Sequence, residues 1–361
     1  MAFNNKLDYN LIVSSPPHIR THETVSSAMY DVVIALIPAF LAATYFFGIN
    51  AIILVSVCIV SAVLTELLMQ RLFGRRVTLF DGSAVVTAVL LAFCLPPATP
   101  WWTAALASFV AIGIAKELFG GLGKNVFNPA LFGRVFVSTL LPFPNAMTNY
   151  LKPFWWKGSS FLNFVLPKTE LQVYKLVDNV GKEVVDAVST ATPLKLMRTG
   201  GLISSTTTFI ERLGFYSKLF LGNRSGNLGE TSVLAILIGA GYLLYKKHID
   251  LKIPLSILIT TFLVILLFGK GQDPVAHLFL GGIMLGSFFM ATDWTTSPMT
   301  TQGKIIYGIG IGLFIGFIRL FGVKPEGVAI GILHMNVISL FIDRVFLPRK
   351  FGMARSLASV S

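Results

Sequence analysis

The chain has 361 residues, of which 54% are hydrophobic and only 13% are charged, and its mean hydropathy is +0.74. An average soluble chain carries roughly 25% charged residues, so this composition excludes a disordered, fibrous or ordinary soluble protein and predicts an integral membrane protein. The formal net charge of +12 does not indicate nucleic acid, because basic loops on the cytoplasmic side of a membrane account for it. The two cysteines, Cys58 and Cys94, lie in apolar runs, which excludes a disulfide scaffold and a cysteine-ligated zinc or iron–sulfur site in this chain.

A polar segment at residues 1–27 precedes a series of long apolar runs. A membrane-spanning helix needs about 20 mostly apolar residues. The sequence therefore predicts an all-α polytopic membrane protein with about ten transmembrane helices, in a first bundle at 28–143 and a second bundle at 230–346. The runs lie at 28–48, 51–70, 83–97, 101–117, 127–143, 230–246, 252–269, 275–291, 304–321 and 327–346.

Basic residues gather in alternate loops and predict the orientation of the chain. If the N-terminus is cytoplasmic, the short outside loops contain only Lys270 and Lys324. Because Lys and Arg accumulate in cytoplasmic loops, we expect both termini in the cytoplasm, with the tail at 347–361 inside and the long segment at 144–229 outside. The basic residues of the inside loops and tail are Arg71, Arg75, Arg76, Lys116, Lys124, Lys246, Lys247, Lys252, Lys304, Arg349, Lys350 and Arg355.

Two short patterns recur in the two bundles. The pattern Gly-Ser followed by Leu-Leu-Ala-Phe at 82–93 resembles Gly-Gly followed by Leu-Gly-Ser-Phe at 281–288, and the pattern at 132–136 resembles the one at 341–346. Two repeats of five helices would have opposite topology, and inverted repeats place binding sites near the midplane beside broken helices. Coincidence among helices rich in Gly and Phe accounts for the same patterns, so both interpretations stay open.

The outside segment contains the run Asp-Ala-Val-Ser-Thr-Ala-Thr-Pro-Leu at 186–194. Thr192 followed by Pro193 is typical of a helix N-cap and a first-turn proline, and backbone N–H groups at such a helix start can bind a phosphate. Lys195 and Arg198 lie one and two turns further and could add charge-assisted contacts. From spacing alone, an ordinary helix cap is the favoured interpretation.

The same run contains Asp-x-x-Ser-[Gly/Thr]-Ala-Thr, and further segments agree with one family of membrane proteins. Over essentially its whole length, the chain resembles the RnfD family of the Rnf electron-transport complex and the paralogous NqrB proteins of the sodium-pumping NADH:quinone reductase. Thr190 stands where the family often has Gly, and both residues are tolerated there. The other matching segments are 14–19, Asp31 with 35–39, 81–84, 123–130 and 290–293.

The resemblance implies a covalent flavin in the outside segment. A flavin transferase would esterify the hydroxyl of Thr192 to the phosphate of FMN, with Asp186, Ser189, Lys195 and Arg198 around the FMN. Attachment through the phosphate leaves the isoalloxazine ring free to accept and release electrons. Electron transfer of this kind needs no catalytic nucleophile, general base or protein-bound metal from this chain.

A second flavin is expected near the cytoplasmic entrance of the fifth run. Asn125 and Asn128 are three residues apart and share a face if this stretch is helical, and their amides can pair with the polar edge of a flavin ring. The resemblance implies a non-covalent riboflavin there. The alternative is that both Asn residues only cap the helix that begins at Pro129.

Ionisable residues within the predicted spans are costly and indicate function by default. Asp31, Glu66 and Arg319 lie near span ends, where we expect their side chains to snorkel to the interface. Asp293 ends the eighth run, and the match at 290–293 makes it a candidate for a cation path. The remaining candidates are Arg134 and Asp343, the latter beside Arg344 and expected to form a local ion pair.

The resemblance implies a membrane flavoprotein of an ion-translocating ferredoxin:NAD oxidoreductase complex in the bacterial inner membrane, coupling electron flow between two flavins to transport of Na⁺ or H⁺. Its expected partners are iron–sulfur and flavoprotein chains, NAD- and ferredoxin-reacting chains, an FMN transferase and the lipid membrane. One alternative is the NqrB component of a sodium-translocating NADH:quinone reductase, which the short N-terminal extension at 1–27 disfavours. Another, from a different class, is a secondary transporter with no redox role.

Overall fold

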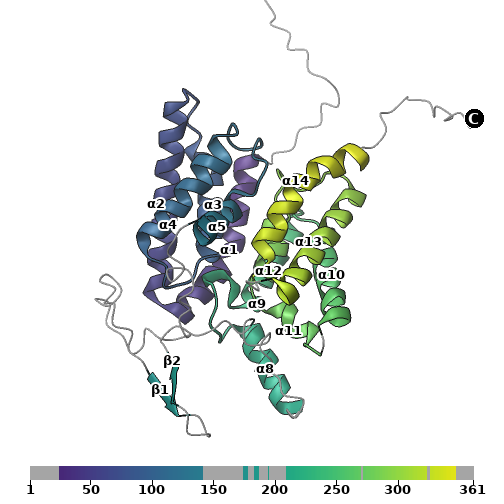
Figure 1. The fold of residues 1–361 in the computed structure, drawn as a ribbon. Coiled ribbons are helices and arrows are strands. Elements are labelled where there is room, and N and C mark those ends of the chain that lie inside the picture. The colour runs from purple at the N-terminus through teal and green to yellow at the C-terminus, as the bar shows by residue number, and fades with distance from the viewer. Residues whose placement is uncertain are drawn as a thin grey trace, which may run out of the picture.

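The computed structural model describes residues 24–140, 174–177, 183–186, 194, 209–269, 271–322 and 326–346. Two groups of helices stand side by side (Figure 1). The first group comprises α1 (Val25–Phe47), α2 (Ile49–Leu72), the 3-10 turn η1 (Leu79–Asp81), α3 (Ser83–Phe93), α4 (Trp101–Phe109), the π-helix η2 (Val110–Glu117) that continues α4, and α5 (Pro129–Leu140).

The second group follows a region with two strands and one outlying helix. The strands β1 (Tyr174–Val177) and β2 (Glu183–Asp186) pair antiparallel, with Tyr174 opposite Asp186, and α8 (Phe209–Leu221) comes next. The second group then comprises η5 (Leu228–Glu230), α9 (Val233–Tyr245), α10 (Lys252–Phe268), α11 (Pro274–Phe279), α12 (Ile283–Leu285), the π-helix η6 (Gly286–Met290), α13 (Thr301–Phe321) and α14 (Val328–Phe346).

The helices have the character of a membrane protein. By length and composition, α1, α2, α13 and α14 could each cross a membrane, whereas α3, α9 and α10 are apolar but shorter. Each of the ten predicted runs contains helix, and the run at 275–291 is divided among α11, α12 and η6. The all-α interpretation of the membrane part is therefore confirmed, whereas the count of ten crossings stays a prediction.

The start of α1 and the end of α14 lie at the same end of the helix groups, and the β-hairpin and α8 lie at the opposite end (Figure 1). This arrangement agrees with an even number of crossings between the two termini. Helices from the two groups also pack in pairs, α1 against α9 and α5 against α14. The first α-helix of each group thus meets the first of the other, and the last meets the last, which is compatible with a pseudo-two-fold relation. The inverted repeat itself stays a prediction.

Small residues allow the closest helix contacts. In α13, a Cβ atom added at Gly308, Gly312 or Gly316 would lie 2.6–2.7 Å from side-chain atoms of α10. This spacing of four residues puts the glycines on one face, where the two backbones can approach closely. At the crossing of α1 and α9, a Cβ atom on Gly239 would overlap the carbonyl oxygen of Ala35. Gly239 therefore sets the separation of the two groups.

Replacing Gly239 with Ala should destabilise the protein, because the added methyl group forces α1 and α9 apart. Overpacking of this kind costs about 1–3 kcal/mol. The matched control is Gly241→Ala in the same helix, where an added Cβ meets nothing within 4 Å. The control should leave stability unchanged or raise it, because Ala favours a helix over Gly by about 1 kcal/mol. Equal thermal unfolding midpoints for the two purified variants in detergent would contradict the close crossing.

Candidate functional site

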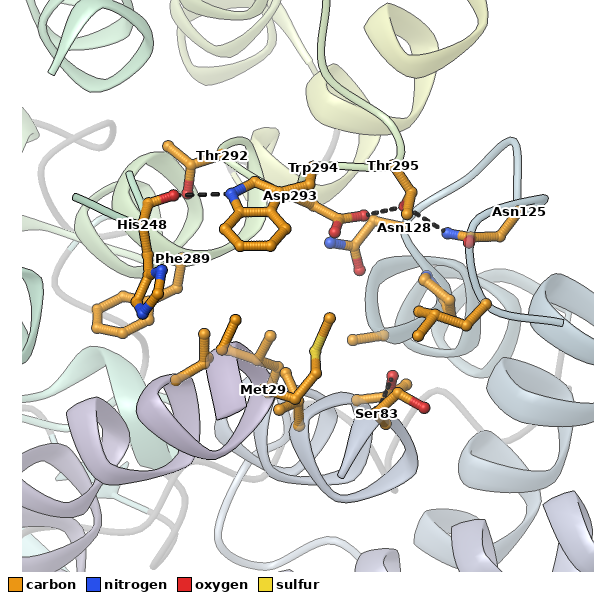
Figure 2. Close-up of a pocket in the computed structure, with 18 of the residues that line it drawn as sticks. Met29, Ser83, Asn125, Asn128, His248, Phe289, Thr292, Asp293, Trp294 and Thr295 are labelled. Carbon is orange, nitrogen blue, oxygen red and sulfur yellow. Dashed lines mark hydrogen bonds between the residues drawn. The ribbon is translucent and has the colours of Figure 1, made fainter. Parts of the chain in front are cut away.

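A cavity opens between the two helix groups, with about 820 Å³ of empty space that is partly open to solvent. Its walls come from α1, α3, the start of α5, the residues after α9 and the turn that follows η6. Met29 and Ser83 lie on one side of the cavity, and Asn125, Asn128 and Asp293 lie on the other (Figure 2). The walls are mostly apolar with a few polar groups, which is the usual character of a small-molecule site.

Both π-helices contribute to this cavity. In η2, the Leu118 amide donates to the Gly113 carbonyl at 3.0 Å, and after η6 the Ala291 amide donates to the Gly286 carbonyl at 2.7 Å. Such i to i−5 hydrogen bonds are rare and occur often at functional sites. The first π-helix brings Lys116 to the cavity wall, and the second brings Phe289.

The two predicted Asn residues have different roles. Asn128 precedes Pro129, and its Oδ1 accepts the Leu131 amide at 3.3 Å, so it caps α5 as the alternative interpretation proposed. Asn125 does not cap this helix. Its Nδ2 donates to the Phe127 carbonyl at 3.1 Å and to Thr295 Oγ1 at 3.0 Å, while its Oδ1 is buried without a hydrogen-bond partner. A buried acceptor of this kind is costly unless a ligand satisfies it.

Asp293 lies in the turn after η6 and lines the same cavity (Figure 2). Its Oδ2 accepts the hydroxyl of Thr295 at 2.8 Å and that of Thr296 at 3.2 Å. Desolvation raises the pKa of this carboxyl above its ordinary value, although hydrogen bonds from the two Thr residues act in the opposite direction. Asp293 is therefore next to the candidate flavin site rather than separate from it.

A second hollow, which adjoins the cavity, shares His248 and Trp294 with it. The indole N–H of Trp294 donates to the His248 carbonyl at 2.7 Å, and the two rings lie 5.8 Å apart. His248 Nε2 lies 2.8 Å from Asp31 Oδ2, and the Tyr242 hydroxyl donates to Asp31 Oδ1 at 2.6 Å. Asp31 is thus held between partners from the second helix group.

The expectation that Glu66 snorkels is wrong. Its side chain is 0% exposed and forms an ion pair with Lys116, at 2.5 Å between Oε1 and Nζ. Lys116 Nζ also donates to Ser83 Oγ at 2.6 Å. Placing Lys116 in an inside loop was likewise wrong, because the residue lies in η2 with a side chain only 3% exposed. Both errors arise because α2 packs against η2 and α3, which turns Glu66 inward.

Two further expectations about charged residues are also wrong. Arg319 is only 1% exposed, and its guanidinium donates to the carbonyls of His277 and Leu280 instead of reaching the interface. Asp343 accepts the Met299 amide at 3.1 Å, and no ion pair with Arg344 exists in the described part of the chain. In addition, Arg134 pairs with Glu326 at 3.1 Å.

The predicted FMN motif at 186–194 is described only at its two ends. Asp186 is the last residue of β2, and Leu194 is buried against Leu219 and Leu280. A small hollow beside Leu194 is also lined by Arg224. The other predicted FMN-site residues, Ser189, Thr192, Lys195 and Arg198, lie outside the described residues.

Sequence reasoning missed Lys116, His248 and Trp294 as cavity residues. Trp294 directly follows the matching segment 290–293, so it could have been predicted from that position. No sequence pattern near Lys116 or His248 predicts that they line the cavity. In the described ranges, no group of three or more His, Cys, Asp or Glu side chains could hold a metal ion.

Residues 12–352 match the family model described as NQR2, RnfD, RnfE family. The chain is 42% identical over 351 residues to the D subunit of the Na⁺-translocating ferredoxin:NAD⁺ oxidoreductase complex of Acetobacterium woodii, a match that covers 96% of this chain and 97% of the relative. It is 39% identical over 348 residues to the D subunit of the proton-translocating ferredoxin:NAD⁺ oxidoreductase complex of Clostridium ljungdahlii, covering 95% and 96%. It is 35% identical over 356 residues to the D subunit of the ion-translocating oxidoreductase complex of Aliivibrio salmonicida, covering 94% and 98%.

Replacing Lys116 with Met should destabilise the protein, because it leaves the Glu66 carboxylate buried without its cation. Removing one partner of a buried pair costs about 3–5 kcal/mol. The double variant Glu66→Gln/Lys116→Met should recover most of the loss, since it removes both charges together. Thermal unfolding of the purified variants in detergent measures both effects. Losses that simply add in the double variant would show that the two charges do not stabilise each other.

Proposed function

Because the chain belongs to the NQR2, RnfD, RnfE family, we propose that it is a membrane component of an ion-translocating ferredoxin:NAD oxidoreductase complex. In this proposal it passes electrons between a covalent FMN and a second, non-covalent flavin, and the transfer is coupled to transport of Na⁺ or H⁺. The observation that carries the proposal is the near full-length similarity to the D subunits of two such complexes. Iron–sulfur, NAD and ferredoxin chemistry would belong to other chains of the complex.

The cavity between the helix groups fits a non-covalent flavin such as riboflavin. Its walls are mostly apolar with a few polar groups, which is the usual lining of a small-molecule site. The unpartnered Oδ1 of Asn125 needs a donor, which the imide N–H of a flavin ring can supply. When bound, the flavin supplies the redox chemistry through its ring system. The protein would bind and orient it through Asn125 and the apolar walls, while Asn128 fixes the start of α5.

The outer site would hold FMN on the hydroxyl of Thr192, attached by an FMN transferase during maturation. Two features support this proposal. The run at 186–194 has the flavinylation pattern, and Leu194, two residues after Thr192, is buried in the fold. Asp186, Ser189, Lys195 and Arg198 remain candidates for the surroundings of the FMN.

We place the upper end of the helices in Figure 1, where α1 begins and α14 ends, in the cytoplasm of a bacterial inner membrane. The charge bias of the loops supports this orientation, although Lys116 no longer counts toward it. The flavin cavity would then lie toward the cytoplasm, and the β-hairpin with the FMN motif would lie outside. Asp293 stays the candidate for the ion path, because it lines the cavity. Its carboxyl group would therefore interact electrostatically with a bound flavin.

The quinone-reducing alternative is weakened by the names of the relatives, which specify ferredoxin and NAD⁺. The assay that separates the two functions is quinone reduction by the purified complex. Sustained quinone reduction without ferredoxin activity would favour the quinone reductase over the ferredoxin:NAD oxidoreductase. A secondary transporter without a redox role would contain no bound flavin at all.

Replacing Thr192 with Ala should abolish covalent flavin, because no other group in the motif is expected to accept the phosphate ester. The measurement is flavin fluorescence of the denatured protein on a gel, with the amount of protein matched. Thr190→Ala, which removes a hydroxyl two residues away, is the control and should keep the fluorescence. A fluorescent Thr192→Ala protein would overturn the assignment of the attachment site.

Replacing Asn125 with Leu should release the second flavin and leave the covalent one in place, since the substitution removes the buried amide that faces the cavity. The flavin that acid releases from the purified complex, quantified by chromatography, should fall by about one per copy of this chain. Asn50→Leu is the matched control, because Asn50 is also buried with an unpartnered Oδ1 but does not line the cavity. Equal flavin release from the two variants would locate the second flavin elsewhere.

A further inference from the structure

We propose that Lys116 is a positioning residue that presents a positive charge to the ligand of the cavity, and that Glu66 partly screens this charge. The inference rests on the proposed second flavin and specifies how the chain sets its redox potential. Among the described residues that line the cavity, Lys116 is the only Lys or Arg. Its ammonium is the one permanent cation that a ligand would meet on this described lining.

Two hydrogen bonds hold the ammonium group of Lys116 in place. Nζ donates to Glu66 Oε1 at 2.5 Å and to Ser83 Oγ at 2.6 Å. The Ser83 hydroxyl in turn donates to Asp81 Oδ1 at 2.6 Å, so its lone pairs point to the ammonium. An ammonium carries three N–H donors, and these contacts use two of them. The third is available to an acceptor in the cavity, whose wall includes both Ser83 and Lys116.

The position of Glu66 explains how the charge is tolerated and limited. An unpaired ammonium would be costly to bury, and Glu66, with a side chain 0% exposed, compensates for it from the side away from the cavity lining. Glu66 Oε1 also accepts Gln70 Nε2 at 3.3 Å, and the same Nε2 lies 3.4 Å from Glu117 Oε1. These contacts fix the Glu66 carboxylate between α2 and η2, so it cannot move toward a ligand in the cavity.

This arrangement has a consequence for an electron-accepting ligand. Reduction adds negative charge to a flavin, and a nearby cation favours that charge more strongly where water is excluded. Lys116 should therefore raise the redox potential of the bound flavin, and Glu66 should lower it by a smaller amount. The electron-rich carbonyl edge of the ring is the acceptor that the third N–H of Lys116 would meet.

The test compares two changes of opposite expected sign in the purified complex. Glu66→Gln keeps the shape of the side chain but leaves Lys116 unscreened, so the midpoint potential of the non-covalent flavin should rise. Glu66→Gln/Lys116→Met removes both charges, and the potential should fall below that of the unmodified protein. The control is Lys124→Met, which removes the same charge from an exposed residue outside the cavity and should change nothing.

The flavin of this cavity is identified as the redox signal that Asn125→Leu removes. The readouts are the midpoint potential of that signal and the content of acid-released flavin. A purely structural ion pair would change stability but would not shift the potential in opposite directions. The role of Lys116 is overturned if the redox signal is present but neither Glu66→Gln nor Glu66→Gln/Lys116→Met shifts its potential, or if both shift it in the same direction. In that case the proposal of a second flavin in the cavity is unaffected. If Asn125→Leu removes no flavin, the second flavin at this cavity fails, and the role of Lys116 fails with it.

Discussion

The contact between α1 and α9 sets the geometry on which the candidate site depends. Because Gly239 has no side chain, the second helix group can approach the carbonyl of Ala35 on the first. The cavity lies along this seam, with Met29 on α1 and Leu243 on α9 in its wall. A wider seam would separate the Asn-bearing loop from the turn after η6, and the hydrogen bond between Asn125 and Thr295 would be lost. The shape of the candidate site is thus a result of helix packing between the two groups.

Buried charge is the second organising feature. Glu66, Lys116, Arg319 and Arg224 are all almost fully buried, and each has partners that it reaches across helix or loop boundaries. In an apolar setting, such contacts replace the hydration that each charge loses. Glu66 and Lys116, which belong to the first helix group, are paired with each other. The two Arg residues at the opposite end are instead bound by backbone carbonyls, which holds the irregular segments around α11 and η5 in place.

Much of the fold could be predicted from the sequence, because long apolar runs indicate membrane helices. The ten runs coincide with helical segments, and the break in the run at 275–291 has a local cause in Gly281, which has a positive φ of 65°. The pairing of Glu66 with Lys116 could not be predicted, because it joins residues 50 positions apart and depends on how α2 meets a π-helix. The cavity itself was foreseen only through Asn125 and Asn128, and the FMN motif was recognised by resemblance rather than by spacing.

The burial of Leu194 limits how far a group carried on Thr192 could move. Leu194 is only 2% exposed, packed against α8 and α11. Two residues of fully extended chain span roughly 7 Å, so the attachment point stays within about that radius of a fixed anchor. A flavin held on so short a tether could not travel between distant redox partners. If Thr192 carries the proposed FMN, a protein that exchanges electrons with it would have to dock near Leu194, beside α8 and α11.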